Sequence, residues 1–363
     1  MNATHRLHDL GQSLWLDQIT RSLLTSGTLR RYIKELSVTG LTSNPTIFDE
    51  ALRGAGVYDQ AIQAKAKQGT ADEALFFDLA LEDLTAAADL LRPAYDATAG
   101  ADGWVSLELS PLLVDDTAKS VQSATQLHAR AQRPNLFIKI PGTPAGVPAI
   151  EEAIFEGIPI NVTLLFSREQ YLAAAEAYLR GIERRLAAGR DPLVRSVASL
   201  FVSRWDVAVK DKVPAELRNR LGIAVAMQVY RAYRELLATA RWQQLAARGA
   251  QMQRLLWAST GTKDPTASDV MYVEGLAAPD TINTMPEKTL LAFSDHGKVG
   301  SPLPTDGGDC EKVLAQFRRA GVDLDALAQT LQRQGAESCT KSWRDLMQCV
   351  ASKRERLSKA VSA

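Results

Sequence analysis

Residues 136–140 read Leu136-Phe137-Ile138-Lys139-Ile140, a short apolar segment with one charged side chain inside it. Because successive side chains of a strand point to opposite faces, Ile138 and Ile140 share one face, and Lys139 shares the other with Phe137. In a barrel, one face of each strand meets the surrounding helices and the other faces the interior. The isoleucine pair must meet the helices, so we expect Lys139 to point into the barrel.

Similar segments recur along the chain, and each is followed by a longer stretch with helical periodicity. This alternation predicts parallel strands joined by crossover helices. About eight strands, without a glycine-rich dinucleotide fingerprint after the first, favour an α/β fold of the closed (β/α)₈ TIM-barrel type over an open doubly wound sheet. The predicted strands are Ser13–Asp17, Val38–Thr42, Trp104–Leu109, Leu136–Ile140, Ile160–Leu165, Val194–Val202, Arg254–Ser259 and Thr281–Met285.

The chain is predicted to form one domain, residues 1–363, with the barrel at about 13–308 and a helical C-terminal extension at about 309–363. Ser167 followed by Gln170 predicts a capping-box start for one barrel helix. In the extension, helices are expected at Val313–Ala320, Asp323–Gln334 and Lys341–Ala360.

The rule that locates Lys139 also applies to four other predicted strands. Leu14 and Leu16 face outward in the first strand, and the same test places Leu107, Leu109, Ile160, Val162 and Leu164 outward. The expected inward side chains are Trp15, Asp17, Ser106, Glu108, Asn161, Thr163, Val197, Ser199 and Phe201. Five strands thus send polar groups into one interior, mostly near their C-terminal ends, where barrel enzymes have their active sites.

A lysine in such an interior can act as a nucleophile. Burial lowers the pKa of an ammonium group, and a free amine attacks carbonyl carbons. Asp17 and Glu108 would raise the pKa of Lys139 instead, but they can also transfer protons. The alternative is that the three groups form a buried structural ion network, although buried ion pairs seldom stabilise a protein on balance.

Composition limits the partners and the compartment. Lys+Arg and Asp+Glu both number 42, so the formal net charge is zero, which argues against a nucleic-acid partner. The N-terminal residues lack an apolar signal-peptide core, and no apolar run reaches the roughly 18 residues of a membrane span. Cys310, Cys339 and Cys349 lack metal-ligand spacing and are expected to be free thiols of a cytoplasmic protein. A monomer and a homodimer both remain open.

Three motifs resemble those of the transaldolase family. Phe137-Ile138-Lys139-Ile140-Pro141-Gly142-Thr143 resembles its Schiff-base lysine strand, Thr42-Ser43-Asn44-Pro45-Thr46 its Thr-Ser/Thr-Asn-Pro-Ser/Thr signature, and Asn161-Val162-Thr163-Leu164-Leu165-Phe166-Ser167 the strand that follows the lysine strand. Their order and spacing agree across roughly residues 14–285. The length and the segment Trp257-Ala258-Ser259-Thr260-Gly261-Thr262-Lys263 resemble the longer bacterial branch, which also occurs fused to an isomerase.

The resemblance implies a class I aldolase-like barrel that transfers a dihydroxyacetone unit from sedoheptulose 7-phosphate to glyceraldehyde 3-phosphate, giving erythrose 4-phosphate and fructose 6-phosphate. It implies Lys139 as the Schiff-base amine, Asp17 as general acid/base, and Glu108 with Thr163 holding a water. Asn44, Asn161 and Ser199 would bind dihydroxyacetone hydroxyls, Phe201 would line the pocket, and Arg204 would bind phosphate. No metal or organic cofactor is implied.

One departure from the family pattern concerns the substrate phosphate. Many members carry a second phosphate-binding arginine after the seventh strand, where this chain offers Ser259 and, further on, Lys263. A lysine binds phosphate as a point charge without the fork of an arginine. Lys263 could equally be a solvated loop residue.

Three other functions remain as alternatives. A fructose-6-phosphate aldolase would release free dihydroxyacetone, but chains of that branch are much shorter. A non-catalytic sugar-phosphate sensor would need no inward amine beside two carboxylates. A metal-dependent barrel hydrolase needs clustered ligands at strand ends, and none of the four histidines lies on a predicted strand.

Overall fold

Eight parallel strands form a closed barrel in the computed structural model, which describes residues 2–54 and 56–362. The strands follow one another around the barrel in chain order, and β8 closes it by pairing with β1. They are β1 Gln12–Asp17, β2 Val38–Thr42, β3 Trp104–Glu108, β4 Leu136–Pro141, β5 Ile160–Leu165, β6 Ser196–Phe201, β7 Arg254–Ala258 and β8 Thr281–Met285. The predicted (β/α)₈ barrel is confirmed.

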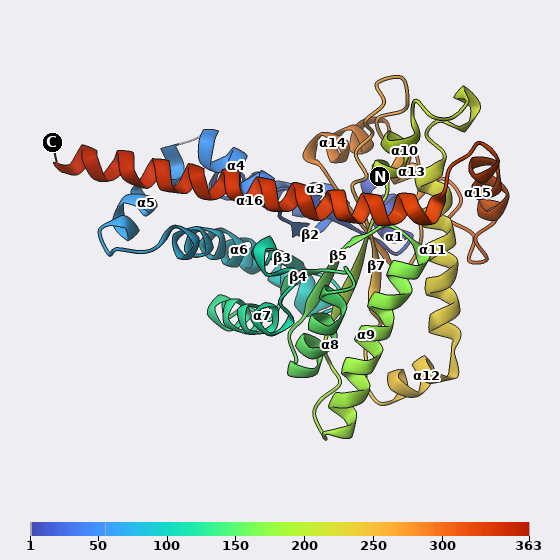
Figure 1. The fold of residues 1–363 in the computed structure, drawn as a ribbon, viewed down its shortest axis with the longest axis horizontal. Coiled ribbons are helices and arrows are strands. Elements are labelled where there is room, and N and C mark those ends of the chain that lie inside the picture. The colour runs from blue at the N-terminus through green and yellow to red at the C-terminus, as the bar shows by residue number, and fades with distance from the viewer. Residues whose placement is uncertain (1, 55, 363) are drawn as a thin grey trace.

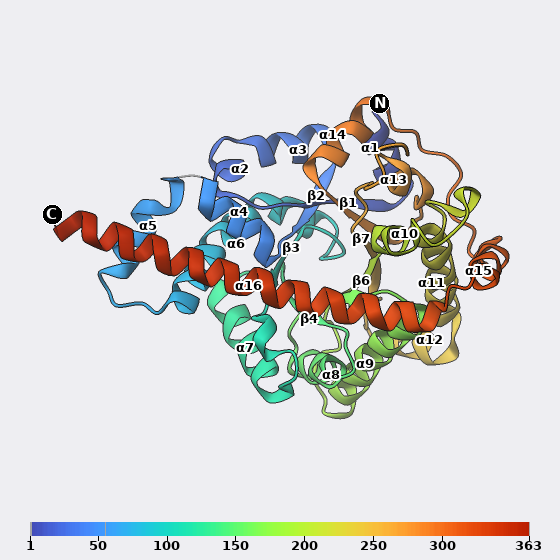
Figure 2. The ribbon, with the colours of Figure 1, turned by 45° about the horizontal axis from the view of Figure 1, so that its top comes forward.

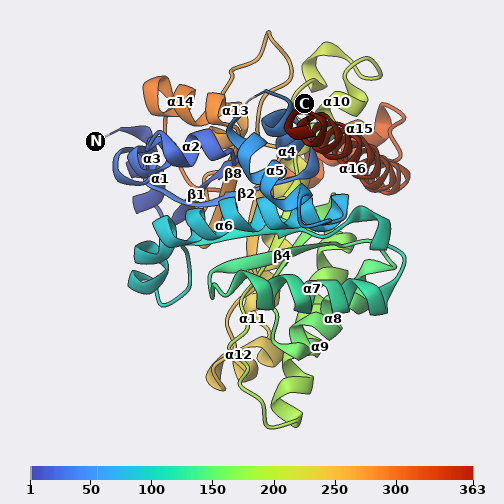
Figure 3. The ribbon, with the colours of Figure 1, turned by 90° about the vertical axis from the view of Figure 1, so that its left-hand side faces the viewer.

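Helices surround the barrel, as Figure 3 shows. They are α1 Ala3–Asp9, α2 Arg21–Thr25, α3 Thr28–Leu36, α4 Pro45–Gly54, α5 Asp59–Ala66, α6 Asp72–Ala97, α7 Thr117–Ala131, α8 Gly146–Glu156, α9 Arg168–Ala187, α10 Ser203–Val209, α11 Leu221–Ala238, α12 Ala240–Ala247, α13 Met271–Gly275 and α14 Glu287–His296. Short 3₁₀ turns are η1 Gly56–Tyr58, η2 Pro111–Leu113 and η3 Ala215–Leu217. None of the helices within residues 2–54 and 56–362 is long and apolar enough to cross a membrane.

The predicted strand ends agree with the structure to within one residue except in β6. This strand was expected at Val194–Val202, but it begins at Ser196. The amide of Val194 bonds to the carbonyl of Pro192, so the preceding residues turn within their own loop. Val202 has φ −100° and ψ −62° and already leads into α10.

The start of α9 follows the predicted capping box. The Ser167 hydroxyl accepts the amide of Gln170 at 3.2 Å, and the Gln170 side chain accepts the amide of Ser167 at 3.3 Å. The apolar face of α9 is buried against its neighbours, with Tyr171, Tyr178 and Ile182 at most 1 % exposed. Helix period and cap together fix how this helix meets the barrel.

Aromatic rings fill the half of the barrel interior that is nearer to the N-terminal ends of the strands. The rings of Trp104 and Phe137 stack with centroids 3.9 Å apart, and Trp15 lies 6.3 Å from Phe137. Gly40 on β2 makes room for this cluster, because a Cβ atom there would lie 2.5 Å from the indole nitrogen of Trp15. Because these rings fill the N-terminal half, the space for a cavity lies in the half nearer to the C-terminal ends of the strands.

Leu164 departs from the predicted alternation. It has φ +59°, and the pairing of β5 with β6 shifts register between Val162 and Leu165. Such a bulge inserts one residue and reverses the alternation beyond it. Leu164, expected to face the outer helices, therefore lines the central cavity, and the expectation was wrong for this residue.

The C-terminal extension ends in one long helix rather than the two that were expected. After α15, Cys310–Arg319, helix α16 runs without a break from Leu324 to Ser362. Figures 1 and 2 show it as the long red helix that passes over one end of the barrel and extends beyond α5. Gly335 was expected to lie outside a helix. A Cβ atom at this position would lie 2.9 Å from Leu164 and 3.3 Å from Arg204, so the missing side chain permits close packing.

Candidate active site

A cavity of about 470 Å³ opens where the barrel strands end. Its walls come from the strand ends, from α4 and the loop after β7, and from α16. All eleven residues that the sequence singled out lie along it: Asp17, Asn44, Glu108, Lys139, Asn161, Thr163, Ser199, Phe201, Arg204, Ser259 and Lys263. Residues from seven different strands and their following loops thus meet at one place.

Lys139 lies in the depth of this cavity. Its Nζ donates to Glu108 Oε2 at 3.0 Å and to the carbonyl oxygen of Ser43 at 3.0 Å. The two side chains are only 9 % and 8 % exposed, and β3 pairs with β4 so that Glu108 and Lys139 are neighbours in register. Strand alternation and register therefore place a carboxylate directly beside the amine.

Asp17 provides a second carboxylate from the end of β1. Its Oδ1 accepts the hydroxyl of Thr42 at 2.7 Å, and Thr42 in turn contacts the hydroxyl of Thr284 at 2.8 Å. Within the described part of the chain, the other oxygen of Asp17 accepts no hydrogen bond. One side of this carboxylate is thus held in place, and the other can receive or deliver a proton.

Two pKa shifts follow from this arrangement. Burial lowers the pKa of Lys139, but the neighbouring Glu108 and Asp17 carboxylates raise it more, so that it lies above its ordinary value. Burial also raises the pKa of Asp17, although the Thr42 hydrogen bond and the Lys139 charge act in the opposite direction. Lys139 is therefore an ammonium group at neutral pH and must lose a proton before it can attack a carbonyl. The sequence alone left this balance open.

Polar side chains of three adjoining strands form a chain of hydrogen bonds beside the amine. Ser199 donates to Asn161 Oδ1 at 2.7 Å, and Asn161 Nδ2 donates to the hydroxyl of Ser106 at 3.2 Å. The hydroxyl of Thr163 bonds to no described side chain, although the residue is only 2 % exposed. Across the cavity, Asn44 accepts the amide of Ile47 through Oδ1, which leaves its NH₂ group for a ligand.

Two cations without carboxylate partners line the outer part of the cavity. The guanidinium group of Arg204 lies 5.3 Å from the ring centroid of Phe201, and neither Arg204 nor Lys263 forms an ion pair with a described residue. Lys263 is exposed in the loop after β7. Ser259, with φ +56°, contacts the hydroxyl of Ser203 at 2.8 Å. Unpaired cations beside hydroxyl groups suit an anionic substrate group.

Sequence reasoning missed the residues that α16 contributes. Ser338, Cys339 and Ser342 line the cavity, and Thr46 of α4 donates to the Ser342 hydroxyl at 2.8 Å. Burial raises the pKa of Cys339 to about 12, so its thiol stays protonated and does not compete with the amine as a nucleophile. The one sequence signal was Gly335, because a glycine inside a helical pattern often marks close packing.

A closed (β/α)₈ barrel with a buried lysine and two carboxylates at its C-terminal end defines a class of enzyme, the aldolase-type barrels. The family model described as Transaldolase/Fructose-6-phosphate aldolase matches residues 14–350. The chain therefore belongs to this family.

Individual relatives with similar sequences are named transaldolases. A transaldolase of Saccharopolyspora erythraea is 43% identical over 361 residues, which cover 98% of this chain and 97% of the relative. One of Thermobifida fusca is 44% identical over 95% of this chain and 96% of its own, and a "Transaldolase 2" of Nostoc punctiforme is 38% identical over 97% and 98%. Transaldolase activity, with a lysine Schiff base, follows from this membership.

Proposed function

We propose that Lys139 is the amine that condenses with the ketone of a ketose phosphate. The supporting observation is its position: a primary amine at the closed end of the cavity, 3.0 Å from Glu108 and facing Asp17. Glu108 takes a proton from the ammonium group, which frees the lone pair of Nζ to attack C2. Loss of water from the carbinolamine then gives the protonated imine, with Glu108 and Thr163 holding the water that carries the protons.

Asp17 performs the carbon–carbon step. It removes the proton of the C4 hydroxyl, the C3–C4 bond breaks, and its electron pair moves into the imine to give an enamine while the aldose phosphate leaves. The enamine carbon then attacks the aldehyde carbon of the acceptor, and Asp17 returns its proton to the new hydroxyl. Hydrolysis of the imine releases the product. Burial raises the pKa of Asp17 above that of an exposed carboxyl, which makes it a stronger base toward the C4 hydroxyl.

The remaining cavity residues bind and orient the substrate. Asn44, Asn161 and Ser199 bind the hydroxyl groups of the dihydroxyacetone unit, and Phe201 packs against it. Arg204 binds the phosphate, with Ser259 and Lys263 as weaker contributors. Sedoheptulose 7-phosphate or fructose 6-phosphate is the donor in this assignment, and glyceraldehyde 3-phosphate or erythrose 4-phosphate is the acceptor.

Borohydride reduction in the presence of fructose 6-phosphate tests the assignment of the amine. Reduction should fix a three-carbon adduct, detected by mass spectrometry, on the peptide that contains Lys139. Lys263→Gln is the matched control, because it removes another lysine of the same cavity and should leave the adduct in place. An adduct on a different lysine, or none, would contradict the proposal.

A second assay separates transfer from simple cleavage. Without an aldose acceptor, a transaldolase should stop after about one turnover, with the three-carbon unit bound to the enzyme. Sustained release of dihydroxyacetone from fructose 6-phosphate would instead identify an aldolase.

We also propose that the barrel and the C-terminal helices form one domain that works in the cytoplasm. The three cysteines are free, which fits a reducing compartment. Helix α16 contacts α4, α5 and β5 of the barrel, which fits a single domain. Limited proteolysis should therefore not yield a stable, active fragment that lacks residues 309–363. Recovery of such a fragment would contradict the single-domain proposal.

A further inference from the structure

Gln332 of α16 connects the two strands that carry the proposed catalytic groups. Its Nε2 donates to the carbonyl oxygen of Gly142 at 3.0 Å and to that of Leu164 at 3.0 Å. Gly142 follows the Lys139 strand β4, and Leu164 directly follows Thr163 on β5. Gln332 itself is only 7 % exposed. Both neighbours are carbonyl oxygens, so only the NH₂ end of the amide can face them, and it uses both hydrogens.

The backbone at this point departs from regular strand geometry. Leu164 has φ +59°, a left-handed conformation that a leucine adopts at a cost. The pairing of β5 with β6 shifts register here, whereas β4 and β5 stay joined by the bond from the Gly142 amide to the Thr163 carbonyl at 2.7 Å. A strained residue of this kind persists only where its surroundings hold it. Gln332 supplies such a contact from outside the barrel.

The bulge determines where the Thr163 hydroxyl points. No described side chain bonds to this hydroxyl, so its direction depends on the backbone of Thr163 and on the rotamer which that backbone allows. That backbone is held at its own carbonyl by Gly142 and at the next carbonyl by Gln332. A change in the conformation of Leu164 would therefore turn the Thr163 hydroxyl relative to Lys139, while Gln332 itself bonds to none of the groups assigned to sugar binding.

We propose that Gln332 is a positioning residue for transaldolase chemistry, acting through the Leu164 bulge on Thr163. The inference rests on the proposed role of Thr163 in proton transfer. It gives α16 a function in the reaction, because this helix places an amide donor between the Schiff-base strand and the strand of the proton-transfer hydroxyl.

The test replaces Gln332 with methionine, which has a similar length and no donor. Gln332→Met should lower kcat roughly 10- to 100-fold with KM for fructose 6-phosphate within about twofold, since a small misplacement impairs chemistry more than binding. Gln329→Met is the matched control, because Gln329 lies about one turn earlier on α16, is exposed and makes no hydrogen bond in the described structure. It should leave kcat unchanged.

A double-mutant cycle distinguishes positioning from a general structural role. If Gln332 acts through Thr163, adding Gln332→Met to Thr163→Val should lower kcat by less than about twofold further. A normal kcat in folded Gln332→Met, or full additivity with Thr163→Val, would overturn the inference. Gln332→Asn, whose shorter amide cannot reach both carbonyls, serves as a second variant if Gln332→Met does not fold, with the same expected loss.

Borohydride trapping of the unmodified enzyme is measured in parallel. Absence of an adduct at Lys139 in that enzyme would refute the proposed mechanism itself. A normal adduct together with unaltered turnover of the Gln332 variants would refute only the positioning role.

Discussion

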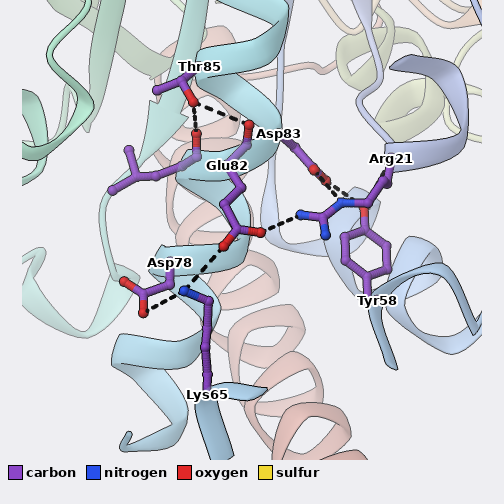
Figure 4. A network of polar contacts seen from close by, with 8 residues as sticks. Arg21, Tyr58, Lys65, Asp78, Glu82, Asp83 and Thr85 are labelled. Atoms are coloured by element: carbon purple, nitrogen blue, oxygen red, sulfur yellow. Dashed lines mark hydrogen bonds and ion pairs between the residues drawn. The ribbon is translucent and has the colours of Figure 1, made fainter. Parts of the chain in front are cut away.

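Asp17, half-buried at the cavity, and Asp83, buried on α6, both have a raised pKa, yet their surroundings differ. Burial is the main cause of the shift in each. Asp83 on α6 accepts the Nε of Arg21 at 2.7 Å through one oxygen and the hydroxyl of Tyr58 at 2.7 Å through the other (Figure 4). Asp17 accepts one hydrogen bond from a described side chain, that of Thr42, and lines the cavity.

The difference separates a structural ion network from a reactive one. In Figure 4, Arg21 also bonds to Glu82 at 2.9 Å, and each charged group is matched within the protein. Around Lys139, a carboxylate oxygen, a threonine hydroxyl and two outer cations have no partner in the described structure, although all line one cavity. Unmatched groups are costly to stability, so their gathering at one place supports chemistry over a structural role for Lys139, Glu108 and Asp17.

The largest effect is expected from Lys139→Met. Transfer of the three-carbon unit should fall at least about 10³-fold, since no other amine lies within ion-pair distance of Glu108 in the described structure. Fructose 6-phosphate should still bind, because the hydroxyl- and phosphate-binding residues remain. Turnover and equilibrium binding measured on the same preparation check both points. A variant with near-normal turnover would eliminate the Schiff-base assignment.

The next largest effect is expected from Asp17→Asn, which should reduce kcat about 10²-fold or more. The same substitution should increase the free energy of unfolding at the higher pH, although it lowers kcat. The folded pKa of Asp17 is raised, so between the ordinary carboxyl pKa and this value the folded protein holds more protons than the unfolded chain, and stability falls as pH rises through that window. The side chain of asparagine does not titrate, so the variant does not lose this stability as the pH rises. Urea unfolding at pH 4 and pH 7 should show the variant gaining stability relative to the unmodified enzyme at the higher pH.

Part of the candidate site could be predicted from the sequence alone. Period-2 alternation placed Lys139, Glu108 and Asn161 in the interior, because that geometry is local and repeats along each strand. It failed at Leu164, because a bulge adds one residue without a mark in the sequence. The direction of the Lys139 pKa shift depends on a 3.0 Å distance between side chains 31 residues apart, which no pattern specifies.

The contribution of α16 shows the same limit for helices. Helical periodicity indicated that the extension packs on the barrel, but not that it crosses the mouth of the cavity. The neighbours that Gln332 and Cys339 reach lie more than 130 residues away in the chain. The predicted interruption after Gln334 was wrong because close packing at Gly335 offsets its poor helix propensity of about 1 kcal/mol.

Arg21→Met should produce the reverse pattern of Lys139→Met. It removes the cation from a carboxylate whose side chain is 3 % exposed and should lower the free energy of unfolding by about 2 kcal/mol, with kcat within about twofold of normal. Arg92→Met is the matched control, because its pair with Asp96 is 46 % and 57 % exposed and should be worth less than about 0.5 kcal/mol. Thermal or urea unfolding checks both. A strong loss of turnover in folded Arg21→Met would show that the network serves catalysis as well.

The smallest effect separates the two cations of the cavity. Arg204 is held against Phe201, so Arg204→Gln should raise KM for a sugar phosphate about tenfold or more through loss of a forked, charge-assisted contact. Lys263 is exposed, so Lys263→Gln should raise KM only a few-fold, and the increase should shrink at high salt because exposed charges are screened. An unphosphorylated ketose donor should show neither increase. Equal effects of the two substitutions would mean that Lys263 takes the role of the arginine that many family members carry after the seventh strand. If Lys263→Gln has no effect, Lys263 is a solvated loop residue.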